Sequence, residues 1–194
     1  MTLENVKKII CFILIFIIRE QLSASEKDDD VPYIRYAKEI MTPFIQKCER
    51  EYNLDCIGTG GKFSKNVAGI NINFIAYRKG TLEEARTLEV NMIETLLTQV
   101  NDHEKIRPFL AECPFKSKDI NISIAFRKND NSCYSDGSVV YVSNIKSKLY
   151  YAAEDPKTEQ RTTISEEPYE EAMKLVYGKA AEVKKDVIPD KQKS

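Results

Sequence analysis

The chain has 194 residues, of which 42% are hydrophobic and 30% are charged, with 29 basic and 30 acidic side chains and a formal net charge of −1. This length favours a single domain. The near balance of charge predicts no nucleic acid and no anionic membrane surface as a partner, because both attract proteins with a clear basic excess.

Residues 1–25 have the pattern of a signal peptide. Lys7 and Lys8 precede an unbroken apolar run of ten residues, 9–18, and small residues follow at positions 23–25. A membrane-spanning helix needs about 20 apolar residues, so this run fits the apolar core of a signal peptide better. We therefore expect cleavage and a periplasmic or secreted protein. An uncleaved membrane anchor is the alternative.

The following stretch predicts a linker, a helix and a short strand. Residues 26–32 form an acidic linker, and apolar residues recur at helical spacing over residues 33–53. Pro43 lies inside this helix, and Thr42 before it resembles an N-cap, so we expect a kink or a restart there. A short strand over residues 53–57 comes next.

The clearest elements are a strand over residues 67–76 and a helix over residues 81–100. In the strand, two sets of side chains alternate, which predicts one face toward the core and one away from it. The apolar arc of the helix is wider than the roughly 100° stripe of a surface helix, so we expect neighbours on more than one side. Arg86 and Glu89 intrude on this arc, and we expect them to pair with each other.

The rest of the chain predicts four more strands and a final helix. The strands are expected over residues 119–128, 139–142, 149–153 and 161–164, and the helix over residues 165–177. Residues 178–194 are rich in lysine and lack periodicity, which is typical of a disordered tail.

Grouped strands without strict βαβ alternation favour an α+β fold. We expect a two-layer sandwich, with a mainly antiparallel sheet of 4–6 strands and the helices packed on one face. The single domain is expected to span residues 33–177.

Motifs of common enzymatic chemistry are weak in this chain. Residues 58–61 are rich in glycine, but they lie between two expected strands, which predicts a hairpin turn with positive φ angles and not a phosphate-binding loop. His103 is the single histidine and no CxxC pair accompanies it, so the sequence predicts no metal site and no cofactor. Cys113 or Cys133 acting with His103 as a nucleophile–base pair is an alternative, which would make the protein a small hydrolase.

Four cysteines lie outside the first 25 residues: Cys48, Cys56, Cys113 and Cys133. An even number in an exported chain permits disulfides, with three possible pairings. The local pairs are Cys48 with Cys56 and Cys113 with Cys133. Free, buried thiols are the open alternative.

The polar face of the two best strands is the candidate binding surface. Its residues are Asn71, Asn73, Tyr77, Asn121, Ser123 and Arg127. Amide, hydroxyl and guanidinium groups suit sugars, peptides or carboxylates. The alternative is an ordinary sheet face in contact with solvent.

Several short motifs are distributed over the chain from residue 57 to residue 172. They are Ile57-Gly58-Thr59-Gly60-Gly61, Glu83-Glu84-Ala85-Arg86, Ile106-Arg107-Pro108, Pro114-Phe115, Val142-Ser143 and Tyr169-Glu170-Glu171-Ala172. In these the chain resembles an uncharacterised family of small exported proteins from chlamydia-like bacteria. The resemblance implies export and a single domain. It assigns no site residues, because none of these motifs is catalytic.

Together, these observations predict an exported, non-enzymatic domain that binds a protein, a peptide or a small polar ligand. The signal peptide and the lack of a catalytic motif support this interpretation. The alternatives are the small hydrolase described above and an interaction protein held in the membrane by its uncleaved N-terminal segment.

Overall fold

The computed structural model describes residues 31–186, with side chains up to residue 178. In chain order its helices and strands are α2 (Pro32–Tyr52), β1 (Asp55–Phe63), β2 (Val67–Ala76), α3 (Leu82–Asp102), β3 (Ile120–Phe126), β4 (Tyr141–Asn144), β5 (Lys148–Glu154), β6 (Arg161–Pro168) and α4 (Tyr169–Asp186). Two short 3₁₀ helices, η1 (Arg107–Phe109) and η2 (Ser117–Asp119), lie between α3 and β3. The expected signal peptide and most of the expected linker lie outside the described residues.

The six strands form one open sheet in the sequential order β1 to β6. Neighbouring strands are antiparallel except β2 and β3, which are parallel. A parallel pair needs a crossover that returns the chain to the same end of the sheet, and α3 provides it. The expected α+β fold with a mainly antiparallel sheet is confirmed.

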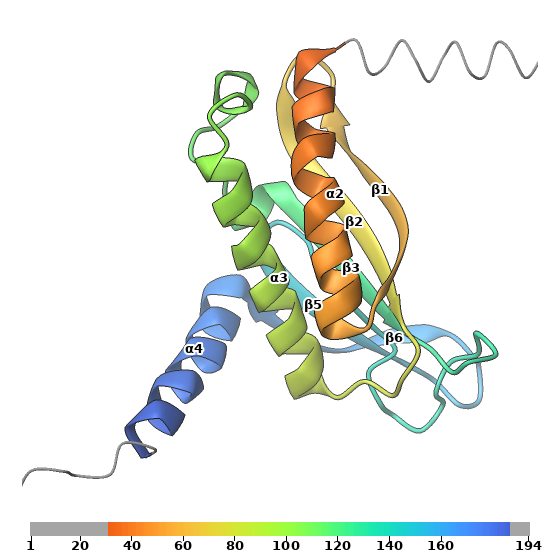
Figure 1. Ribbon diagram of the computed structural model, residues 1–194. Helices are drawn as coiled ribbons and strands as arrows, with labels where there is room; N and C mark the ends of the chain where they lie inside the picture. Colours follow the sequence, from red (N-terminus) through yellow and green to blue (C-terminus); the bar gives the residue numbers. More distant parts are fainter. Residues whose placement is uncertain (1–30, 187–194) are drawn as a thin grey trace, which may run out of the picture.

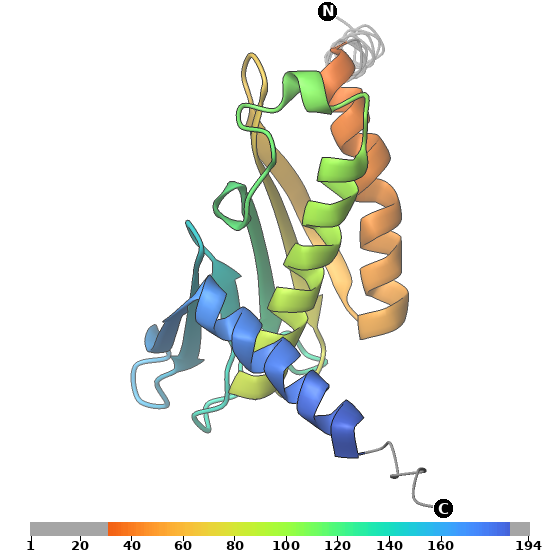
Figure 2. The ribbon, with the colours of Figure 1, turned by 90° about the vertical axis from the view of Figure 1, so that its left-hand side faces the viewer.

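The three helices of the described chain lie on the same face of the sheet (Figure 1). Helices α2 and α3 run side by side in opposite directions, and α4 crosses over α3 (Figure 2). α3 is therefore covered by the sheet and by two helices, which accounts for its wide apolar arc. Eight of its side chains are buried.

The core lies between the helices and the inner face of the sheet. The expected alternation of β2 and β3 is confirmed, because Ile70, Ile72 and Phe74 of β2 are buried, as are Ile122, Ile124 and Phe126 of β3. Paired side chains in adjacent strands stand beside each other on one face of a sheet, so these side chains form a continuous apolar layer under α2 and α3. No helix of the described part of the chain is long and apolar enough to cross a membrane.

The expected glycine turn is wrong. The glycines lie within β1, where Gly58 pairs with Asn73 and Gly60 with Asn71, and none of them has a positive φ angle. Gly61 is needed for a different reason: a Cβ atom there would lie 2.5 Å from the carbonyl oxygen of Gly69 and would overlap the ring of Phe63. Gly61 therefore permits close approach of neighbouring atoms, whereas Gly60 has open space beside it, and the hairpin turn lies beyond them at residues 64–66.

The helix boundaries differ from the expectation in two places. α2 continues through Pro43 without a restart, and this proline lies on its exposed side, where a free carbonyl group can bond to water. The final helix does not begin at residue 165, because residues 165–168 complete β6 and pair with β5. α4 then continues to Asp186, so residues 178–186 belong to this helix and not to the expected disordered tail. Residues 187–194 lie outside the described chain.

The expected pair of Arg86 and Glu89 does not form. The Arg86 Nε atom donates instead to Oε1 of Glu167 at 2.7 Å, in a contact that is mostly shielded from solvent. Glu167 also accepts a hydrogen bond from the hydroxyl group of Tyr151. Arg86 and Glu89 do not pair because α3 is covered on several sides and each of the two residues faces a different neighbour.

Candidate binding site on the outer face of the sheet

The face of the sheet that points away from the helices, called the outer face below, carries the predicted binding residues. The parallel register of β2 and β3 places Asn71 beside Asn121 and Asn73 beside Ser123. On the next strands Tyr141, Ser143 and Tyr150 occupy the same face, whereas Tyr151 is in the core. The register therefore brings four of the six predicted residues together on this face.

The structure separates the six predicted residues into two groups. Four of them form hydrogen bonds within the chain. The hydroxyl group of Ser123 donates to Oδ1 of Asn73 at 2.6 Å. The Tyr77 hydroxyl donates to Oδ1 of Asn131 at 3.0 Å, and Arg127 Nη1 donates to Sγ of Cys133 at 2.8 Å. These contacts fix the middle of the sheet and the loop over residues 128–140. They leave few polar atoms for a ligand.

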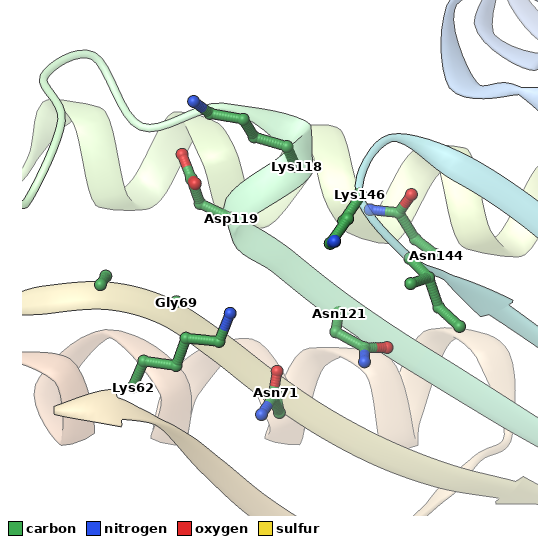
Figure 3. A pocket seen from close by; sticks show the side chains of 10 residues that line it. Lys62, Gly69, Asn71, Lys118, Asp119, Asn121, Asn144 and Lys146 are labelled. Atoms are coloured by element: carbon green, nitrogen blue, oxygen red, sulfur yellow. The ribbon is translucent and has the colours of Figure 1, made fainter.

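The other two residues, Asn71 and Asn121, line a pocket. Neither amide forms a side-chain hydrogen bond with another described residue. The pocket has a volume of about 190 Å³ and lies at the end of the outer face where β3 begins (Figure 3). Its lining consists of Lys62, Ala68, Gly69, Asn71, Lys118, Asp119, Asn121, Asn144, Ile145 and Lys146.

Sequence reasoning missed most of this lining because it comes from separate parts of the chain. Lys62 comes from β1, Lys118 and Asp119 from η2, and Lys146 from the turn between β4 and β5. The one local signal was the short connection between the strands expected over residues 139–142 and 149–153, which is typical of a hairpin. Nothing in the sequence states that this hairpin lies beside the start of β3.

The lysines around the pocket differ in their partners. Lys118 forms an ion pair with Glu112, as does Lys116, and the hydrogen bonds from these two lysines lower the pKa of Glu112 to about 2. Asp119 accepts a hydrogen bond from the backbone N–H of Lys116 at 3.1 Å. Lys62 and Lys146, by contrast, form no ion pair within the described chain. The pocket lining therefore contains two lysines without an ion pair, the Asp119 carboxylate and two unpartnered amides.

The residues of the alternative hydrolase site do not assemble. His103 lies 3.8 Å from Glu39, its Nδ1 atom accepts the backbone N–H of Ile106, and its ring lies against Tyr36. No cysteine is among these contacts. Within residues 31–178, no group of three or more histidine, cysteine or acidic side chains could hold a metal ion.

The four cysteines are free thiols. Burial raises the pKa of Cys48 to about 12, and burial also raises the pKa of Cys56 and Cys133. A raised pKa keeps a thiol protonated, whereas nucleophilic and metal-binding cysteines need the thiolate. Cys113 is exposed, and neither of the two local disulfide pairs is formed.

A second unusual group lies in the core. Glu89 is fully buried, and neither of its carboxyl oxygens receives a hydrogen bond of normal geometry. Burial raises its pKa well above the usual range, and the nearby backbone N–H of Asn144 lowers it only in part. Since ionising a carboxyl group away from water is costly, Glu89 is held as the neutral acid.

Comparisons with known proteins do not identify this fold or its pocket. No family model matches the chain, and neither a curated protein nor a solved structure matches it.

Proposed function

We propose that the protein is an exported, non-enzymatic binding domain that holds a peptide or a small polar ligand at the pocket end of its outer face. The observation that supports this proposal is the pair of unpartnered amides, Asn71 and Asn121, side by side in an open pocket. Buried or half-buried polar groups in folded proteins usually have partners, so amides left without one are available to a ligand.

The chemistry of the pocket suits binding more than catalysis. Its amides can both donate and accept hydrogen bonds, and its lysines carry positive charge. The pocket lining contains no histidine, cysteine or serine side chain that could act as a nucleophile or shuttle a proton at neutral pH. The small hydrolase therefore has no geometric support.

Export is supported by the pattern of residues 1–25 and by the resemblance to small exported proteins. The test is the mass of the chain after expression in a bacterial host with an export pathway. Loss of the first 24 or 25 residues, with recovery from the periplasm or the medium, is the expected result. Retention of the whole segment in the membrane fraction would favour the membrane-anchored alternative.

Binding can be tested by replacing Asn121 with tryptophan, which fills the pocket. Neutral and charged monosaccharides and short peptides would be screened against the protein by ligand-observed NMR. Ligands found with the unchanged protein should bind at least about tenfold more weakly to Asn121→Trp.

The matched control is Gln46→Trp, which adds the same ring at an exposed position of α2, an element of the opposite face. This variant should bind as the unchanged protein does. Equal binding by Asn121→Trp and Gln46→Trp would contradict the proposed site.

A further inference from the structure

We propose that the pocket is an oxyanion site, which takes the carboxylate or phosphate group of a small hydroxylated molecule. This inference rests on the proposed function and names its ligand class. It is carried by the placement of Lys62 and Lys146 relative to Asn71 and Asn121.

The two lysines approach the same space from opposite sides. Figure 3 shows the Lys62 side chain reaching from β1 across β2, and the Lys146 side chain reaching from the other side toward β3, with Asn71 and Asn121 between them. The side chains of Lys118 and Asp119 point away from this space. An anion placed there would meet two ammonium groups and two amides, and charge-assisted hydrogen bonds are the stronger kind.

The stem of the Lys62 side chain lies over a glycine of the neighbouring strand. Lys62 pairs with Gly69 across β1 and β2, and its Cγ and Cδ atoms lie 3.6 and 3.5 Å from the position that a Gly69 Cβ atom would occupy. These are ordinary van der Waals distances, so the stem of Lys62 lies directly over Gly69. Both residues line the pocket, and the ammonium group of Lys62 extends over it (Figure 3).

Lys146 is held in an unfavourable backbone conformation. Lys146 and Ser147 form a two-residue hairpin turn, with φ angles of 52° and 61° and two hydrogen bonds between Ile145 and Lys148. Both positions of this turn type favour asparagine or glycine, because other residues are strained at positive φ. A lysine at such a position is less stable than the common alternatives. Strain of this kind is concentrated at functional sites.

Several bonds from other elements hold this turn in place. The Ser147 hydroxyl is 2.8 Å from that of Ser117, and the Ser147 carbonyl accepts the backbone N–H of Tyr169 at 2.9 Å. The Asn144 amide donates to the carbonyl oxygens of Ser117 and Ile120 at 2.7 and 2.6 Å. The Lys146 backbone is thus positioned before any ligand arrives, which lowers the entropic cost of binding.

The size and the remaining lining define the rest of the ligand. A volume of about 190 Å³ corresponds to roughly six water molecules, each of about 30 Å³ in the liquid. Asn71 and Asn121 can bond hydroxyl groups in either direction, and the half-exposed Ile145 side chain offers an apolar contact to a carbon skeleton. A monosaccharide-sized acid or phosphate ester fits this description.

The test uses three probes that differ only at one carbon of the sugar: glucuronate, glucose 6-phosphate and glucose. Binding is measured by NMR titration of the full chain, with its N-terminal segment as the expression host leaves it. At least one anionic probe should bind about tenfold more tightly than glucose, as expected for one charge-assisted contact. The tighter of the two anions identifies the carboxylate or the phosphate as the preferred group. Higher ionic strength should weaken binding of the anion and leave glucose unchanged.

Three lysine variants test the geometry. Lys62→Gln and Lys146→Asn should each reduce the advantage of the anion over glucose about tenfold. Lys65→Gln, in the adjacent turn and outside the pocket lining, should not change it. Lys146→Asn should also raise the melting temperature, because asparagine tolerates this backbone conformation better. A variant that is more stable and yet binds anions more weakly cannot be explained by unfolding.

The possible failures are distinguishable. If glucose binds as tightly as both anions, and Asn121→Trp abolishes that binding, the oxyanion site is refuted while the proposed binding face stands. If the anions bind equally well to Lys62→Gln and Lys146→Asn, the oxyanion site is again refuted. If no probe binds, the oxyanion inference is overturned, and the wider ligand screen on Asn121→Trp decides the proposed function.

Discussion

Replacing Glu89 with glutamine should remove a loss of stability that develops as the pH rises. The folded protein holds Glu89 as a neutral acid because burial raises its pKa well above the usual range. In the unfolded chain the same group ionises with a pKa of about 4.3. Between these two pKa values the folded state keeps a proton that the unfolded state has released.

The sign and the size of the effect follow from this difference in bound protons. One extra proton on the folded state lowers the free energy of unfolding by about 1.4 kcal/mol for each pH unit. The contribution of Glu89 to stability is therefore fully present below its pKa in the unfolded chain, and it is lost as the pH rises through its pKa in the folded protein. Glu89→Gln has nearly the same volume and no titrating group, so its stability should lack this component of the slope.

Urea unfolding followed by circular dichroism between pH 4.5 and pH 8 measures these slopes, since the chain has no tryptophan to report by fluorescence. The difference in unfolding free energy between Glu89→Gln and the unchanged protein should grow in favour of the variant as the pH rises. Glu104→Gln, at an exposed position, controls for the loss of one negative charge. Parallel curves for Glu89→Gln and the unchanged protein would refute the reasoning, because Glu89 would then ionise alike in both states.

Three further substitutions test the packing. Arg86→Met should lower the free energy of unfolding by about 3 kcal/mol because it leaves the mostly shielded Glu167 carboxylate without its cation. Arg35→Met breaks the exposed ion pair between Arg35 and Glu39 and should cost less than about 0.5 kcal/mol; similar losses for both would contradict the shielding of the Arg86–Glu167 pair. Gly61→Ala should lower the free energy of unfolding by roughly 1–3 kcal/mol through steric overlap, whereas Gly60→Ala has open space and should change it by less than about 0.5 kcal/mol. Urea unfolding compares the two variants, and equal effects would refute the argument from close approach at Gly61. Thr81→Ala removes the N-cap of α3, which accepts a backbone hydrogen bond at 3.1 Å, and should cost about 1 kcal/mol; an unchanged unfolding midpoint would show that this cap does not contribute.

The patterns that predicted the fold correctly are those in which one face of an element is buried. Alternation in β2 and β3 identified both strands and the face that each turns to the core, because successive side chains of a strand point to opposite faces of the sheet. The wide apolar arc of α3 likewise indicated contacts on several sides. In these elements the need to bury apolar groups produces a local periodic pattern in the sequence.

The glycines of β1 show that a local sequence pattern can be ambiguous. Glycine serves in turns with positive φ, and it also serves where atoms of neighbouring strands approach closely. The sequence favoured the first use, but the ring of Phe63 and the carbonyl oxygen of Gly69 impose the second on Gly61. Which use applies depends on atoms that become neighbours only after the strands have paired.

The pairing of charges depended even more on tertiary structure. Arg86 and Glu89 are close along the helix, yet Arg86 bonds to Glu167, 81 residues away, and Glu89 is buried without a partner. A helix brings residues three and four positions apart within reach of each other. Only the packing of β5, β6 and α4 around α3 determined that Arg86 has a partner and Glu89 has none.

The sequence by itself therefore determined the α+β class, the inner and outer faces of the two central strands, and the polar character of the outer face. The tertiary structure decided which polar residues remained available, since Asn73 and Ser123 bond to each other while Asn71 and Asn121 do not. It also brought Lys62 from β1 and Lys146 from the turn between β4 and β5 to the same pocket. The physical reason is that hydrophobic periodicity is a local property of the chain, whereas a pocket is made by residues that meet only when the whole sheet has formed.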